Sequence, residues 1–300
     1  MYIWIASFLF YLYIYLFCCG LRWLLHRFVP RTPEDTPWLS AIFEALATLQ
    51  ICAPIFDVEL VWNTYGRLAV FFQIWMFEYF NWRTIYDAYG HPGYFFAAKT
   101  TKELRRERLS YLATGQLIGG LLSWPMTLLF WRFKLVDEHW DKYLQEDCEN
   151  DLTVSVLNGC IIECLGAYAV RYMELNTQHH RIRAFINSFW CGLLTAIGIS
   201  FTGFYVHPIV ASMVTIGCGE LSYWQHFKVY WIACLLGWYA AELVYAVKTE
   251  PKRPKHSYQI RISTDQPTPM LSMTAAPPPS AILNSRSPNP QGLMNGEACQ

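Results

Sequence analysis

The run of 36 residues from Ala184 to Gly219 contains no Asp, Glu, Lys or Arg. About 20 apolar residues span a bilayer, and a buried helix of a soluble protein is typically uncharged over a shorter stretch. Two further runs, Tyr2–Leu21 and Leu109–Trp131, are uncharged as well. We therefore predict an integral, multi-pass membrane protein that lies in a lipid bilayer.

Charge and cysteine usage exclude several classes of protein. The chain has 23 basic and 23 acidic residues, so its net charge is zero, which argues against a nucleic-acid partner. Its ten cysteines follow no CxxC spacing, which predicts neither a disulfide framework nor a zinc site. No nucleophile, base and orienting group converge in the sequence, and we expect neither an enzyme nor a cofactor or metal site.

Seven apolar stretches are candidate spans. They cover residues 2–25, 41–60, 66–88, 109–131, 152–172, 184–206 and 227–247. As a single helix, the uncharged run 184–219 would be about 54 Å long at 1.5 Å per residue. The hydrocarbon core is only about 30 Å thick, and two full spans need about 40 residues. The run therefore predicts one span and half of another, with the break at Pro208.

Basic and acidic loops alternate along the chain. Lys99–Arg108 is strongly basic, whereas Val136–Asp151 is acidic, which predicts a cytoplasmic C-terminus. Residues 1–40 are interpreted as a signal anchor and a basic linker, because no basic segment precedes the first apolar stretch as in a cleaved signal peptide. Residues 248–300 are rich in Pro, Ser, Thr and Asn and are predicted to be a disordered cytoplasmic tail.

The remaining stretch, 41–247, contains an internal repeat. Residues 41–131 and 152–247 each follow the order span, span, short apolar element, span. Both short elements contain a His-Pro pair, and each half carries a Glu about 45 residues earlier, in its first span. The residues that define the two motifs and these carboxylates are Gly90, His91, Pro92 and Gly93; His207, Pro208, Ile209 and Val210; and Glu44 and Glu163. An odd number of spans in each half predicts an inverted repeat.

Proline is favoured at the first position of a helix. Each short element is therefore predicted to be a half-helix that begins near the bilayer midplane and directs its positive dipole end there. Two such ends repel cations and can orient a small dipolar solute. The side chain before each proline, His91 or His207, could donate a hydrogen bond into a pore.

These features resemble the aquaporins, or major intrinsic proteins, whose paired half-helices begin with Asn-Pro-Ala. Thr202-Gly203-Phe204-Tyr205-Val206-His207-Pro208-Ile209 is similar to that family's second motif and the residues before it. Within the family, the unorthodox superaquaporin branch has deviant first motifs and a Cys nine residues after the second motif, the position of Cys218. The resemblance implies an all-α membrane fold with six core transmembrane helices, two re-entrant half-helices and here one extra N-terminal span. It also implies that Glu44 and Glu163 hold the half-helices.

The sequence departs from the family at both motifs. Histidine replaces both Asn residues, and Val210 occupies the position of the family's selectivity Arg, which predicts a wider and less polar constriction. The resemblance implies a passive channel for water and small neutral solutes such as glycerol or hydrogen peroxide. It further implies a homotetramer. It also implies a location in an intracellular membrane, that of the endoplasmic reticulum, rather than in the plasma membrane. The alternatives are a non-conducting structural or interaction protein with the same fold and a seven-span receptor.

Overall fold

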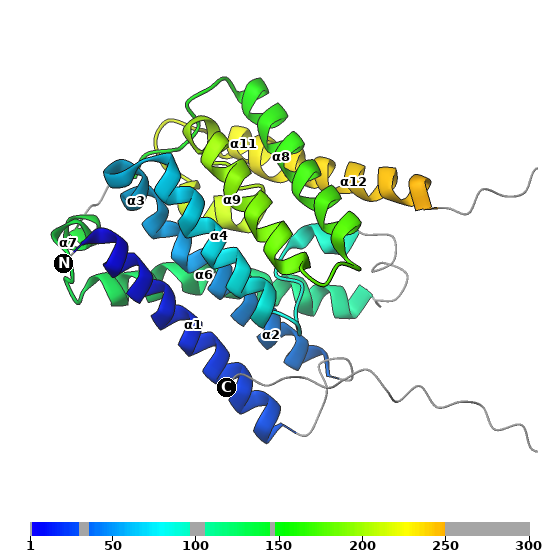
Figure 1. Ribbon diagram of the computed structural model, residues 1–300, viewed down its shortest axis with the longest axis horizontal. Helices are drawn as coiled ribbons and strands as arrows, with labels where there is room; N and C mark the ends of the chain where they lie inside the picture. The colour runs from blue at the N-terminus through cyan, green and yellow to red at the C-terminus, as the bar shows by residue number, and fades with distance from the viewer. Residues whose placement is uncertain (1, 30–35, 97–105, 145–147, 250–300) are drawn as a thin grey trace, which may run out of the picture. The chain divides into compact units, whose positions relative to one another are not determined.

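The computed structural model describes residues 2–29, 36–96, 106–144 and 148–249 (Figure 1). The described residues form helices and no strands. Their bounds are α1 Ile3–Phe28, α2 Pro37–Cys52, η1 Ala53–Asp57, α3 Val58–Tyr65, α4 Arg67–Thr84, η2 Pro92–Phe96, α6 Arg106–Trp131, α7 Asp137–Leu144, α8 Val156–Thr177, α9 Arg183–Thr202, α10 Pro208–Thr215, α11 Tyr223–His226, η3 Phe227–Ala233 and α12 Cys234–Thr249. The tail from residue 250 and the basic residues Lys99, Lys102 and Arg105 lie outside the described ranges.

Five helical stretches are long and apolar enough to cross a bilayer. They are Ile3–Phe28, Pro37–Tyr65, Arg108–Trp131, Arg183–Thr202 and Tyr223–Thr249. The predicted stretches 66–88 and 152–172 also contain helices, α4 with 18 residues and α8 with 22, but ionisable residues make both less apolar. The prediction of an all-α membrane protein is confirmed.

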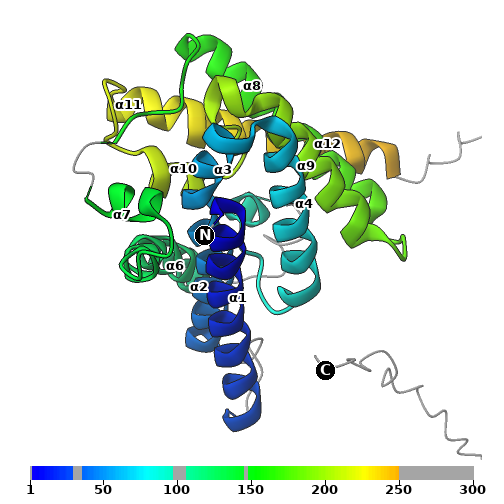
Figure 2. The same ribbon diagram turned by 60° about the vertical axis from the view of Figure 1, so that its left-hand side comes forward.

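The helices pair in a way that relates the two halves of the chain. Helix α2 packs along α6, α8 packs along α12, and α4 packs along α9 (Figures 1 and 2). Glycines allow close backbone approach in these pairs, because a side chain on Gly119 would collide with the backbone of Ala45, and one on Gly237 with that of Cys164. Gly192 also lies close to the backbone of α4, although less tightly, since a Cβ there would be 2.8 Å from the carbonyl oxygen of Phe71. Small residues of this kind are typical of contacts between membrane helices.

The N-terminal helix α1 is joined to the rest of the fold by buried polar contacts. It lies along α2 in both views (Figures 1 and 2). Near its start, Ser7 Oγ donates to Asp57 Oδ2 at 2.8 Å, and near its end Arg22 Nη1 donates to Gln50 Oε1 at 3.1 Å. Asp57 also accepts hydrogen bonds from Trp131 of α6, so one buried carboxylate connects three parts of the chain.

Candidate functional site

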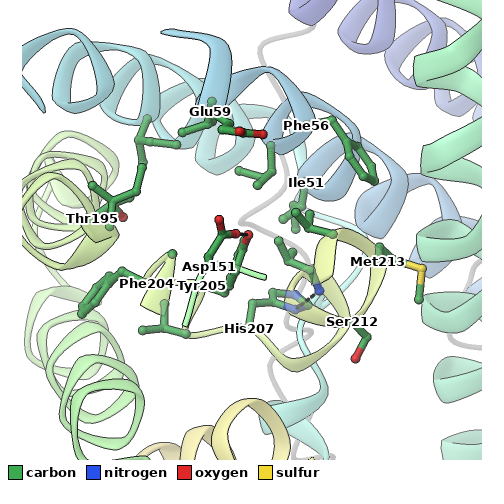
Figure 3. A pocket seen from close by; sticks show the side chains of 18 of the residues that line it. Ile51, Phe56, Glu59, Asp151, Thr195, Phe204, Tyr205, His207, Ser212 and Met213 are labelled. Atoms are coloured by element: carbon green, nitrogen blue, oxygen red, sulfur yellow. Dashed lines mark hydrogen bonds between the residues drawn. The ribbon is translucent and has the colours of Figure 1, made fainter. Parts of the chain in front are cut away.

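A cavity of about 1240 Å³ extends along the helices that enclose it. At one end its lining includes Glu59, at the start of α3, and Asp151, ahead of α8. Near the other end it includes Trp82 and Glu174, which lie close to the C-terminal ends of α4 and α8. The cavity therefore follows most of the length of the bundle, and both His91 and His207 line it. Figure 3 shows the side chains around His207.

The second His-Pro pair lies in a sharp break between α9 and α10. Helix α9 ends with Gly203 in the left-handed region at φ 74°, and α10 begins at Pro208. The Glu163 carboxylate of α8 accepts hydrogen bonds from Thr202 Oγ1 at 2.6 Å, from the backbone N–H of Tyr205 at 3.2 Å, and from that of Val206 at 2.7 Å. The uncharged run thus divides into a long helix and a short one, as predicted, although the break already starts at Gly203 rather than at Pro208.

The first His-Pro pair is held in a corresponding way. Glu44 of α2 accepts hydrogen bonds from the backbone N–H of Tyr89 at 2.7 Å and that of Gly90 at 2.9 Å. Gln116 of α6 donates to the same carboxylate at 2.8 Å. Pro92 then opens the short 3₁₀ helix η2, and residues 97–105 after it lie outside the described ranges. In each half, a buried carboxylate therefore accepts N–H groups just ahead of the histidine.

Each imidazole forms a hydrogen bond with a backbone carbonyl of the other half of the chain. Nε2 of His91 lies 3.1 Å from the carbonyl oxygen of Val206, and Nε2 of His207 lies 2.7 Å from that of Gly90. Each Nδ1 accepts a backbone N–H of its own segment, from Gly93 at 2.9 Å and from Val210 at 3.3 Å. Because a neutral imidazole has one donor and one acceptor, each Nε2 carries the proton and donates to the opposite carbonyl.

This arrangement corrects one prediction. The Nε2–H groups of His91 and His207, expected from the sequence to donate into a pore, are used by backbone carbonyls instead. The rings lie edge to face with their centroids 4.4 Å apart, and both are largely buried. The pair therefore joins the two segments to each other, and neither ring has a free donor for a solute.

The residues that precede the histidines, Gly90 and Val206, are equivalent in the two halves. Both have positive φ, 66° and 47°, and a β-branched residue rarely adopts such a conformation. The N–H of each is bound by the carboxylate of its own half, and its carbonyl by the histidine of the other half. Hydrogen bonds on both sides thus hold a strained backbone at Val206, of the kind that costs about 1–3 kcal/mol.

Ile209 and Val210 follow Pro208 at the start of α10. Both side chains are buried and pack in one apolar cluster with Cys52. Val210 also lines the cavity, so the wall at this point is apolar, as the sequence predicts. In the other half, Gly93 lies so close to the Trp238 ring that any side chain at this position would collide with it.

Cys218 forms a disulfide with Cys148, which lies ahead of α8. The interpretation of the cysteines as containing no disulfide framework missed this bond, because 70 residues separate the two and neither lies in a recognisable spacing. Both cysteines line the cavity at the end marked by Glu59 and Asp151. Burial raises the pKa of the neighbouring Asp151 carboxyl above its ordinary value. In the described part of the chain, no three His, Cys, Asp or Glu residues are grouped as a metal site.

Several proteins with a similar sequence are aquaporins of the superaquaporin branch. Aquaporin-11 of Milnesium tardigradum is 27% identical over 197 residues, 66% of this chain and 72% of that protein. Aquaporin-11 of Rattus norvegicus is 23% identical over 222 residues, 71% and 80% of the two chains, and the human putative aquaporin-12B is 24% identical over 170 residues, 55% and 56%. The chain is a superaquaporin homologue. Profiles of known protein families give no match.

Beside its predicted motifs, this superaquaporin homologue has a cluster that the sequence analysis missed. Trp238 of α12 stacks on His91 with ring centroids 4.0 Å apart. Arg171 of α8 lies against the rings of Trp238 and Tyr94, at 4.7 and 4.5 Å. Glu174 and Glu242 form ion pairs with the same guanidinium. The available signal was a largely buried arginine in a predicted span, a residue that is costly unless it is paired.

Proposed function

We propose that this chain forms a passive channel for water and small neutral solutes such as glycerol or hydrogen peroxide. The observation that carries the proposal is the single cavity that follows α4 and α8 and passes both His-Pro segments. Glu44 and Glu163 serve as supports of the two re-entrant segments, because they bind backbone N–H groups that would otherwise be unpaired inside the membrane. Homology to aquaporins supports a membrane channel in the same way.

The proposed pore is less selective than one with an arginine at its constriction. Val210 contributes no charge and no hydrogen-bond donor to the cavity wall, and the two imidazole donors are already used. Cation exclusion then depends on the dipoles of the half-helices. The second of them, α10, has eight residues. Uncharged solutes larger than water are therefore expected to pass together with water.

An osmotic assay tests the channel. Proteoliposomes with the purified chain are expected to shrink or swell at least several-fold faster than empty vesicles after an osmotic step, because a water-filled path lowers the barrier of the bilayer. The matched control is Val210→Trp, which places a large ring into the cavity and should return the rate to that of empty vesicles. A wild-type rate equal to that of empty vesicles for water, glycerol and hydrogen peroxide would favour the non-conducting alternative.

We further propose an orientation in the endoplasmic reticulum membrane. The Cys148–Cys218 disulfide supports it, because disulfides persist on the lumenal or extracellular side and are rare in the cytosol. The acidic loop that contains Cys148 is then lumenal, and the C-terminus and the basic loops are cytoplasmic. A homotetramer is proposed on the resemblance alone.

Protease protection checks this orientation. In intact endoplasmic reticulum vesicles, an epitope tag at the C-terminus should be removed by added protease, whereas a tag between Asp137 and Cys148 should stay protected until detergent is added. Mass spectrometry of the unreduced protein should recover the peptide pair joined through Cys148 and Cys218. The opposite protection pattern would reverse the proposed topology.

A further inference from the structure

The two histidines in the middle of the cavity offer no free donor to a solute. The imidazole donors of His91 and His207 are bound to backbone carbonyls, and the lining near them includes the apolar side chains of Ile51, Ile74 and Val210. Figure 3 shows Ile51 from α2 on one side of the cavity near His207 and Thr195 from α9 on another. A polar solute that passes the histidines therefore depends on other polar groups of the wall, its acceptors among them.

One of the carboxylates of this wall lies in the interior of helix α4. Glu78 lines the cavity from α4, eleven residues after the start of that helix, which is about 17 Å along an axis about 27 Å long. It is thus well separated from both ends of the helix. An ionisable residue at such a depth is costly and by default indicates a functional site.

A directional chain of hydrogen bonds ends at Glu78. Arg22 of α1 donates to Gln50 Oε1 at 3.1 Å, and Gln50 Nε2 donates to Asn81 Oδ1 at 2.9 Å. Because the Asn81 oxygen accepts from Gln50, its amide nitrogen is the group that bonds to Glu78 one turn earlier. Each amide therefore accepts a hydrogen bond with its oxygen and donates one with its nitrogen on the side of the carboxylate. Successive hydrogen bonds in one direction reinforce one another. The chain begins at a buried arginine and ends at a carboxylate that lines the cavity.

Among the described residues that line the cavity, no Lys or Arg forms an ion pair with this carboxylate. Cys191 of α9 and Tyr11 of α1 are the ionisable groups that interact with Glu78, and neither is a cation. The lysine among the lining residues, Lys142, pairs with Glu59 at 2.8 Å at the far end. Thr195 also lines the cavity, on the same helix as Cys191.

We propose that Glu78 is a solute-binding point of the channel and that it selects small solutes with two or more O–H or N–H donors. This inference rests on the proposed channel function. A small polyol such as glycerol and a small amine such as methylamine in its uncharged form share this chemistry. The donors of either solute can bind Glu78, while the apolar part lies against Ile51 and Ile74. Water has no apolar part to lie against Ile51 and Ile74 and is expected to depend less on this anchor.

Two substitutions separate solute binding from pore shape. Glu78→Leu removes both acceptor oxygens at similar side-chain size, whereas Glu78→Gln keeps one of them. In proteoliposomes, we expect glycerol permeability relative to water permeability to fall about tenfold in Glu78→Leu and less in Glu78→Gln, the size of effect expected for losing about one hydrogen bond to the carboxyl group. Glu138→Gln on α7, which is exposed, is the matched control and should keep the wild-type ratio.

The outcomes are distinct. A fall in the ratio for glycerol, for uncharged methylamine or for both supports the inference and identifies whether the site accepts O–H donors, N–H donors or both. If wild type conducts water but both variants keep the wild-type ratios for both solutes, the inference is overturned and the channel function stands. If Glu78→Leu is not recovered from the membrane, Glu78→Gln alone decides by the same ratio. If wild type conducts nothing, both proposals are rejected together.

Discussion

Replacing His207 by alanine is expected to lower the free energy of unfolding by about 3 kcal/mol and to abolish most osmotic water permeability. The substitution leaves the buried carbonyl of Gly90 without its donor, which costs about 1–3 kcal/mol. It also removes the cap that the imidazole provides to the N–H of Val210, which adds about 1 kcal/mol. The two re-entrant segments then lose one of the two bonds that join them across the cavity.

Asparagine is the matched substitution at this position. Its amide oxygen can replace Nδ1 as the cap, and its amide nitrogen carries two N–H groups, one for the Gly90 carbonyl and one for the cavity. His207→Asn should therefore keep most of the thermal stability and raise water permeability above wild type. Thermal unfolding in detergent and stopped-flow light scattering measure the two quantities. Equal stability of wild type and the alanine variant would show that the hydrogen bond between His207 and the Gly90 carbonyl does not stabilise the fold.

The same logic predicts coupling between the two histidines. His91→Ala should resemble His207→Ala, because Nε2 of His91 binds the carbonyl of Val206, whose backbone has positive φ. Once one of the two hydrogen bonds between the segments is lost, the segments are less well ordered, and the remaining hydrogen bond contributes less to the free energy of unfolding. The double variant should therefore lose less than the sum of the single variants, whereas additive losses would indicate two independent caps.

The features of this protein that could be predicted are those that depend on neighbouring residues or on regular spacing along the chain. The uncharged run 184–219 implied a long and a short helix, and the structure contains α9 and α10 at this position. The correspondence between Glu44 and Glu163 also follows from the sequence, because each precedes its His-Pro pair by a similar number of residues. Both signals depend on local pattern and spacing, which a single chain displays directly.

The unpredictable part depends on groups that only the fold brings together. The acceptor for His207 is a backbone carbonyl 117 residues away, and no residue type signals a carbonyl. Glu78 becomes interpretable only when Asn81, Gln50 and Arg22 are seen in line, and these come from three helices. Sequence position likewise does not relate Cys148 to Cys218.

The second large effect is expected at Glu163. Its carboxylate binds the side chain of Thr202 and two backbone N–H groups of the break between α9 and α10, and it is fully buried. Glu163→Ala leaves these three donors unpaired in an apolar interior, where each costs about 1–3 kcal/mol. We expect a loss of about 4 kcal/mol or more in the free energy of unfolding, and little folded protein in the membrane.

Glu163→Gln distinguishes charge from shape. The glutamine oxygen can accept two of the three hydrogen bonds, but its NH₂ group then faces a donor, so an intermediate loss is expected. Glu138→Gln, exposed on α7, should unfold like wild type. Thermal unfolding in detergent ranks the variants, and hydrogen exchange at Tyr205 and Val206 localises the effect, because these N–H groups should exchange faster in both Glu163 variants. Unchanged exchange there would mean that Glu163 does not hold the segment ahead of His207, and that its own helix contacts account for its burial.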